Sequence, residues 1–422
     1  MKNINLKFPN NFLWGSATSS HQVEGDKHND WTEWEKSARR ISYLKKSGLA
    51  DQYGLDNFIS ARACRHYHLF HDDFQTAKDL GHNSTRFSIA WSRVEPEEGK
   101  FNQAEIDHYV AKARKLRELG MEPIVTLWHW PIPIWLRDIG GWENKKTIEY
   151  FSRFVTKIVE AMKDDVTYWI TLNEPEIYAG ASYLTSEWPP QKHNPIAYLK
   201  VTNNLIKAHK TAFTAIKNIQ ANALVGIATD NIYFEPYKNK LINKLLAHFA
   251  DWWINFYFLN RIKNHQDFIG VNYYFHNRIN YGFGKNENRI ISDMGWELYP
   301  QGIYNVLMDL KKYNKPIIIT ENGLADAEDR KRAWFILESL KAVHRAIEDG
   351  ADVHGYLHWS LMDNFEWAFG FWPRFGLIEV EYKNHERRIR PSAYFYRDIC
   401  LTNGLTDKIY NDYFDLIEKV DE

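Results

Sequence analysis

The stretch that decides the fold class is Tyr168–Pro175, which reads YWITLNEP. It begins as an apolar run of strand length and ends in a carboxyl group, Glu174. A second stretch, Pro316–Gly323 (PIIITENG), repeats the arrangement with Glu321. A charge is expensive to bury unless it is paired or takes part in chemistry, and parallel-sheet proteins keep reactive groups where strands open into loops. The two stretches therefore predict two carboxyl groups that face one cleft.

Short apolar runs alternate with longer amphipathic segments along the chain. Eight runs are rich in β-branched or aromatic residues: Phe12–Ala17, Ser84–Ile89, Glu122–Leu127, Tyr168–Leu172, Leu224–Ala228, Phe268–Val271, Pro316–Thr320 and Gly355–Ser360. Helical spacing of apolar residues marks Gln103–Leu119, Lys145–Met162, Pro195–Gln220, Gln301–Lys312 and Arg330–Glu348. Strand and helix repeated eight times predict the α/β class and a closed parallel (β/α)8 barrel, the TIM barrel. An open doubly wound sheet is the alternative, but no Gly-x-Gly-x-x-Gly follows any run.

A length of 422 residues suggests two or three domains, yet one α/β barrel accepts long insertions. No linker or low-complexity tract divides the chain, so we expect a single domain over residues 1–422. The longest segments between runs are Thr18–Asn83 and Tyr273–Lys315, which we expect at the C-terminal mouth of the barrel around a cleft. The loop after Glu321 is expected to be short, because Glu328–Arg332 already read as helical.

Charge and cysteine content exclude several classes of function. The 53 basic and 54 acidic residues are balanced without a basic run, which argues against nucleic acid and anionic membranes as partners. Met1–Phe12 lacks the apolar core of a signal peptide, and no stretch of about 18 uncharged apolar residues predicts a membrane span. Cys64 and Cys400 are too few for a disulfide framework or a cysteine zinc site. We expect a cytoplasmic protein without a metal site.

Several short motifs follow one another in a characteristic order. They are Phe12–Thr18 (FLWGSAT), Gln22–Gly25 (QVEG), Arg86–Arg93 (RFSIAWSR), His129–Trp130, Thr171–Pro175 (TLNEP), Asn272–Tyr274 (NYY), Ile319–Gly323 (ITENG), Trp359–Trp367 (WSLMDNFEW) and Arg374–Ile378 (RFGLI). Each is weak alone, but the ordered set from residue 12 to about residue 396 resembles family 1 of the glycoside hydrolases, the β-glucosidase family. Compared with that family, the chain is shorter between the sixth helix and its strand, where Asn260–Gln266 leads straight into Asp267–Asn272, and in the loop after Glu321. These shortened loops imply a more open cleft and leave the preference for the aglycone, the departing group, open.

The chemistry of glycoside cleavage fits the two glutamates. A retaining glycosidase needs a carboxylate beneath the anomeric carbon and a carboxylic acid beside the leaving oxygen, about 5–5.5 Å apart. The residues alone leave the two roles interchangeable. The resemblance implies that Glu174 is the general acid/base and Glu321 the nucleophile, with Arg86 and Tyr274 close to Glu321 to keep it ionised. Glu174, beside that negative charge in an aromatic cleft, is then expected to have a raised pKa.

The resemblance also implies a set of sugar-binding residues. They are Gln22, His129, Trp130, Asn173, Asn272, Trp359, Glu366, Trp367 and Phe375. Amide and imidazole groups can both donate and accept, as a hydroxyl does, and Trp359 resembles the ring on which the sugar stacks. The phosphoglycosidase branch of the family carries a small hydroxyl residue where this chain has Glu366. A carboxylate there accepts hydrogen bonds from the 4- and 6-hydroxyls and repels a phosphate, so we expect an unphosphorylated hexoside.

These features predict a retaining, exo-acting β-glycosidase, a β-glucosidase first of all, that acts on small β-glycosides and short oligosaccharides without a cofactor. β-Galactosidase, β-fucosidase, β-mannosidase and transglycosylase activities stay open, as does the oligomeric state. An endo-acting glucanase is disfavoured, because Gln22, His129 and Glu366 are expected to close off the non-reducing end. A catalytically inactive carbohydrate-binding protein is a remote alternative, since such proteins typically lose one carboxylate and this chain has both.

Overall fold

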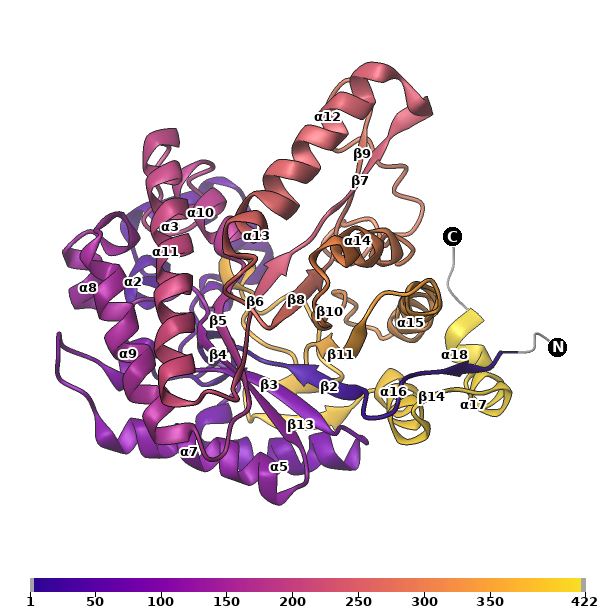
Figure 1. Ribbon diagram of the computed structural model, residues 1–422, viewed down its shortest axis with the longest axis horizontal. Coiled ribbons are helices and arrows are strands. Elements are labelled where there is room, and N and C mark those ends of the chain that lie inside the picture. The colour runs from indigo at the N-terminus through magenta and orange to yellow at the C-terminus, as the bar shows by residue number, and fades with distance from the viewer. Residues whose placement is uncertain (1–3, 419–422) are drawn as a thin grey trace.

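The computed structural model describes residues 4–418, and its centre is a closed barrel of eight parallel strands (Figure 1). The barrel strands are β2 (Leu13–Ala17), β3 (Ser84–Ser88), β4 (Glu122–Trp128), β5 (Tyr168–Asn173), β6 (Leu224–Asp230), β8 (Phe268–Tyr273), β10 (Ile317–Asn322) and β11 (Val353–Trp359). β11 pairs with β2 and closes the ring. All eight predicted runs are barrel strands, which confirms the TIM-barrel prediction and excludes the open doubly wound sheet. Three residues at the start and four at the end of the expected domain, residues 1–422, lie outside the described residues.

Long amphipathic helices surround the barrel. They include α5 (His66–Asp79), α7 (Gln103–Glu118), α9 (Lys146–Met162), α11 (Pro195–Ile219), α14 (Gly302–Leu310) and α15 (Arg332–Glu348). α11 begins where the carboxamide oxygen of Asn194 accepts hydrogen bonds from the N–H groups of Ile196 and Ala197, and Pro195 takes the first helical position. The inner surface of the barrel is filled by Ile124, Ile170, Ala228, Phe268, Ile318 and Leu357.

α15 begins later than the sequence predicts. The stretch Glu328–Arg332 was expected to be helical, but the helix starts only at Arg332. The carboxylate of Asp326 accepts hydrogen bonds from the N–H groups of Arg330, Lys331 and Arg332 at 3.2, 2.8 and 2.9 Å. These bonds give the chain before the helix an alternative to helical bonding, and they satisfy donors that a helix start leaves unpaired.

The part of the chain between β2 and α5 is built from short helices that the sequence did not predict: α1 (Ser20–Val23), α2 (Asp30–Glu35), α3 (Ala38–Lys46), α4 (Leu49–Tyr53) and the 3-10 turn η1 (Leu55–Phe58). A second unpredicted unit is an arm that extends from the barrel in Figure 1. It comprises β7 (Tyr233–Pro236), β9 (His276–Ile279) and α12 (Leu241–Asp251), with the two strands paired in parallel. A π-helical turn, Trp252–Phe256, continues α12 into α13 (Tyr257–Ile262).

The remaining elements connect or cap the barrel. They are the short helices α6 (Trp91–Val94), α8 (Ile134–Asp138), α10 (Pro175–Tyr183), α16 (Pro391–Thr402), α17 (Asp407–Asp412) and α18 (Phe414–Glu418), the 3-10 turns η2 (Gly141–Glu143), η3 (Tyr237–Asn239), η5 (Lys311–Tyr313) and η6 (Trp367–Phe369), and the strand pairs β1 (Leu6–Lys7) with β14 (Gly404–Leu405) and β12 (Ile378–Glu381) with β13 (Glu386–Ile389). Within residues 4–418 no helix is both long and apolar enough to cross a membrane.

Candidate active site

The two glutamates lie at the C-terminal ends of the barrel strands and line one cavity of about 310 Å³. Glu321 is the last residue but one of β10. Glu174 directly follows β5 and directly precedes Pro175, the first residue of α10. The backbone of Glu174 has a φ of 40°, a left-handed conformation that is uncommon for a residue with a side chain. Its N–H donates to the carbonyl of Ala228 at 2.8 Å. Such backbone conformations concentrate at sites of function.

Glu321 receives a hydrogen bond on each carboxyl oxygen. Arg86 Nη1 lies 2.5 Å from Oε1, and the hydroxyl of Tyr274 donates to Oε2 at 2.8 Å. Burial raises the pKa of Glu321 above its ordinary value, while Arg86 and Tyr274 act to lower it. The net direction is upward, so the cation and the phenol oppose the effect of burial without cancelling it.

Among the described residues, no cation forms an ion pair with Glu174. Its Oε1 accepts a hydrogen bond of 2.6 Å from the amide of Asn272, whose own oxygen accepts from Thr320 Oγ1 at 2.7 Å. That second bond sets which way the Asn272 amide faces. Burial and the negative charges of Asp230 and Glu321 raise the pKa of Glu174 well above its ordinary value. The pKa values of both glutamates are thus raised, and that of Glu174, which is not paired with an arginine, is raised further.

His129 and Asn173 form a hydrogen-bonded pair on the cavity wall. The Asn173 oxygen accepts from Arg86 Nη2 at 2.6 Å, so its amide nitrogen is the donor toward His129 Nε2 at 3.2 Å. His129 Nε2 is therefore the acceptor, and the proton of the neutral ring is on Nδ1. Burial lowers the pKa of His129 well below its ordinary value, which keeps the ring neutral. Nδ1 is buried and has no partner among the described residues.

Tryptophan rings form the part of the cavity wall next to His129, whose ring centroid lies 5.8 Å from that of Trp367. Trp359 and Trp367 are 3% and 4% exposed, and the ring of Trp130 lies 4.4 Å from that of Trp367. Trp130 Nε1 donates to the carbonyl of Asn173 at 2.9 Å, which ties this ring to the end of β5. Phe375 packs edge-on against Tyr274 with ring centroids 6.4 Å apart. Flat aromatic surfaces of this kind suit the apolar C–H face of a sugar.

Glu366 is positioned through Gln22. The amide nitrogen of Gln22 lies 2.9 Å from Asn364 Oδ1 and 3.2 Å from Glu366 Oε2, so the helix α1 is joined to the segment after β11. Burial and the charge of Glu321 raise the pKa of Glu366 to about 8. Below that pH the group is a carboxylic acid that can both donate and accept a hydrogen bond.

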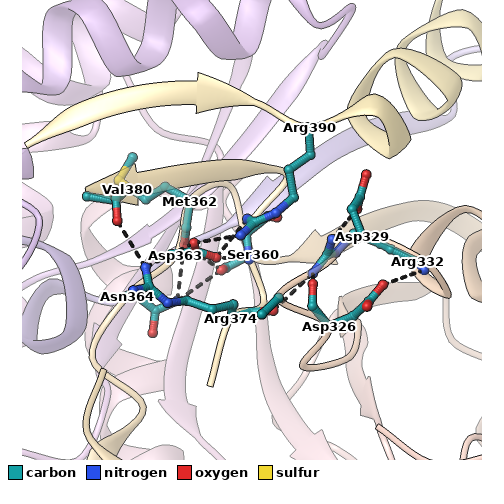
Figure 2. A network of polar contacts seen from close by, with 12 residues as sticks. Asp326, Asp329, Arg332, Ser360, Met362, Asp363, Asn364, Arg374, Val380 and Arg390 are labelled. Carbon is teal, nitrogen blue, oxygen red and sulfur yellow. Dashed lines mark hydrogen bonds and ion pairs between the residues drawn. The ribbon is translucent and has the colours of Figure 1, made fainter. Parts of the chain in front are cut away.

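A buried polar network supports this segment from behind (Figure 2). Both terminal nitrogens of Arg390 lie 2.9 Å from the carboxylate oxygens of Asp363, and Arg374 Nη1 lies 3.3 Å from the same carboxylate. The N–H of Gly376 adds a fourth bond at 2.9 Å. Asp363 is fully buried, and these donors compensate its charge. The network thus holds the chain that carries Glu366 and Trp367.

Ten of the predicted residues line the cavity: His129, Trp130, Asn173, Glu174, Tyr274, Glu321, Trp359, Glu366, Trp367 and Phe375. Arg86, Gln22 and Asn272 lie behind this wall and are bonded to residues on it. Sequence reasoning missed further lining residues, namely Ile177, Ala181, Glu187, Trp188, Asp230, Phe275, Trp296 and Phe369. Asp230 carried only a weak signal, because it is a carboxyl residue two positions after the apolar run Leu224–Ala228. Among the described residues, no group of three or more His, Cys, Asp or Glu side chains is arranged to hold a metal ion.

The chain is similar to known glycoside-cleaving enzymes over most of its length. The model of glycosyl hydrolase family 1 matches residues 4–260 and 243–405. Beta-glucosidase A of Acetivibrio thermocellus is 33% identical over 94% of this chain and 99% of its own length, and a beta-galactosidase of Pyrococcus woesei is 30% identical over 95% and 98%. The structure of a beta-glycosidase from Pyrococcus horikoshii has 37% identity and a TM-score of 0.87, covering 97% of this chain and 98% of its own.

A beta-glucosidase from Thermotoga maritima in complex with glucoimidazole has a TM-score of 0.87 at 30% identity, and covers 94% of this chain and all of its own. The family match spans nearly all of the described residues, and it includes both strands that end in the paired glutamates. These findings confirm the resemblance and the reaction class, the hydrolysis of glycosidic bonds. The chain belongs to glycosyl hydrolase family 1.

Proposed function

We propose that the protein is an exo-acting β-glucosidase in which Glu321 is the nucleophile and Glu174 the general acid/base. The observation that carries these roles is the unequal surroundings of the two carboxyl groups. Arg86 and Tyr274 stabilise negative charge on Glu321, and no cation within residues 4–418 forms an ion pair with Glu174. A nucleophile must be ionised and an acid must carry a proton, so this difference supports the assignment of the two roles.

The proposed reaction is a double displacement. A carboxylate oxygen of Glu321 attacks C1 of the sugar, while Glu174 gives its proton to the leaving oxygen, and the bond between C1 and that oxygen breaks. Glu174 is then ionised and takes a proton from a water molecule. The resulting hydroxide oxygen attacks C1, which releases the sugar and restores Glu321 as a carboxylate. Transglycosylation uses the same residues, with an acceptor hydroxyl in place of water.

We infer that the sugar in the cavity is an unphosphorylated hexose. The N–H on Nδ1 of His129 and the carboxyl of Glu366 offer hydrogen bonds to hydroxyl groups. The expectation that Glu366 repels a phosphate needs refinement, because its pKa of about 8 leaves it largely protonated at neutral pH. None of the residues that line the cavity is a lysine or an arginine, so a phosphate dianion has no cation to pair with.

The test is p-nitrophenol release from p-nitrophenyl β-D-glucoside by the wild type and by Glu321→Gln. The amide is close in size to the carboxylate but cannot form the glycosyl ester, so we expect a loss of several orders of magnitude. Glu160→Gln, an exposed residue of α9, is the matched control and is expected to keep full activity. Equal activity of Glu321→Gln and the wild type contradicts the assigned nucleophile. A wild type that cleaves the β-galactoside and leaves the β-glucoside intact contradicts the assigned sugar.

A further inference from the structure

Asp230 is a buried carboxyl group without a hydrogen-bonding partner in the active-site cavity. It is the last residue of β6, lines the cavity and is 2% exposed. Neither of its carboxyl oxygens has a partner among the described residues. Its backbone N–H donates to Glu176 Oε1 at 3.0 Å, so only the backbone of Asp230 is held. A buried polar group normally has its hydrogen bonds satisfied, and one that does not calls for an explanation such as a ligand or a catalytic role.

The barrel places Asp230 beside Glu174. β6 is the neighbour of β5, and the N–H of Glu174 donates to the carbonyl of Ala228, two residues before Asp230 on β6. On its other side Asp230 is in register with Asn272 of β8, the residue that donates to Glu174 Oε1. Asp230 therefore lies between two strand ends that both position Glu174.

The surrounding charges are mostly negative. Among the described residues, the titratable groups that line the cavity with Asp230 are Glu174, Glu187, Glu321, Tyr274, Glu366 and His129. Glu176 of α10, Tyr273 of β8 and Arg86 of β3 are close by but do not line it. His129 is neutral, and Arg86 is bonded to Glu321 and Asn173. No cation among the described residues is bonded to Glu174 or Asp230. Neighbouring carboxyl groups of this kind cannot all ionise, and the proton stays on the group that ionises last.

We propose that Asp230 is a positioning residue for the proton: once ionised at alkaline pH, it acts through Glu174 and keeps that group protonated until the leaving oxygen takes the proton. The inference rests on the proposed role of Glu174 as the general acid. Burial raises the pKa of Asp230 to about 8, and its negative charge is the largest effect on the pKa of Glu174 after burial itself. Once Asp230 is ionised, its negative charge opposes the ionisation of Glu174.

The test uses Asp230→Asn, which removes the charge and keeps the shape. We expect the alkaline limb of kcat/KM to move to lower pH by about one unit for phenyl β-D-glucoside, whose leaving group needs a proton. For 2,4-dinitrophenyl β-D-glucoside, whose leaving group departs without a proton, we expect a much smaller shift. Asp107→Asn, an exposed residue of α7, is the matched control and is expected to leave both profiles unchanged. Superimposable profiles of Asp230→Asn and wild type with the phenyl glucoside overturn the proposal.

Two further measurements separate this role from others. In a Glu174→Gln background, Asp230→Asn should have no further effect on the alkaline limb, because the group through which it acts is gone. A shift that persists in that background overturns the inference. If Glu174→Gln itself cleaves the phenyl glucoside as fast as wild type, the proposed function fails instead. Asp230→Ser, a smaller neutral side chain, should give the same shift as Asp230→Asn, and it serves where the asparagine variant does not fold.

Discussion

Tyr274→Phe isolates a single hydrogen bond to the proposed nucleophile. The change removes the hydroxyl that donates to Glu321 Oε2 at 2.8 Å, and leaves Arg86 on Oε1. The ring itself stays, so its edge-on contact with Phe375 is kept. Burial and the charge of Glu321 raise the pKa of Tyr274 well above its ordinary value of 10, so the hydroxyl is a donor throughout the range of the assay.

The magnitude follows from the charge of the acceptor. A hydrogen bond to a charged group is worth about 1.5–3 kcal/mol, which corresponds to about one to two pKa units. The bond lowers the pKa of Glu321, so its loss raises that pKa. Since Glu321 must be ionised to attack, the acid limb of kcat/KM should move to higher pH by about one to two units. At a pH below the limb, kcat/KM falls by about 10- to 100-fold.

The assay is kcat/KM for p-nitrophenyl β-D-glucoside over a range of pH that includes both limbs. Tyr281→Phe, at a 65% exposed position on the arm, is the matched control and should reproduce the wild-type profile. An unchanged acid limb in Tyr274→Phe refutes the reasoning, because the hydrogen bond would then contribute nothing to the ionisation of Glu321. Movement of the alkaline limb alone also refutes it, because Tyr274 would then act on Glu174.

Two more predictions concern binding and stability. Glu366→Gln should raise KM for the β-glucoside by about 10-fold, as expected for roughly 1.4 kcal/mol of lost hydrogen bonding. The variant should have no activity on the 6-phosphoglucoside, because none of the described residues that line the cavity is a lysine or an arginine. Efficient cleavage of the phosphorylated substrate would show that reasoning to be wrong. Asp363→Asn should lower the free energy of unfolding in urea by about 3–5 kcal/mol, because the buried guanidinium of Arg390 loses its partner (Figure 2). The control Glu386→Gln, in an exposed ion pair, should unfold as wild type does, and equal stability of both variants contradicts the role of the network.

The barrel strands could be predicted because each contributes an apolar run to a buried sheet. The bounds of β6 could not, since Thr229 and Asp230 are polar residues that continue the strand into the cavity. Hydrophobicity in the sequence predicts that a strand ends where its apolar run ends. The backbone of β6 continues to pair with β8 beyond that point, as far as Asp230, which lies opposite Asn272. The missed residue Asp230 is a consequence of that difference.

The segment between β2 and β3 shows a second limit of prediction from the sequence, this time for helices. The helices that precede α5 in this segment are too short to stand out as a periodic pattern, and α1 has only four residues. Tertiary contacts hold it instead, such as the bond from Gln22 to Glu366, which joins residues far apart in the chain. A pattern within one segment contains no information on such a partner. The place of Gln22 was therefore available from family resemblance, while its bond to Glu366 needed the structure.

The carboxyl groups of the cavity are costly to the fold, and that cost itself points to function. The pKa of Asp230 is raised from 3.8 to about 8, so its contribution to stability is greatest below pH 4 and is lost progressively as the pH rises toward 8. At pH 7 the loss is about 4 kcal/mol, from roughly three pKa units at 1.36 kcal/mol each. No hydrogen bond among the described residues offsets it at either oxygen. A group that only supported the fold would be replaced without loss by an amide, so we expect the benefit of the carboxyl to lie in the proton on Glu174.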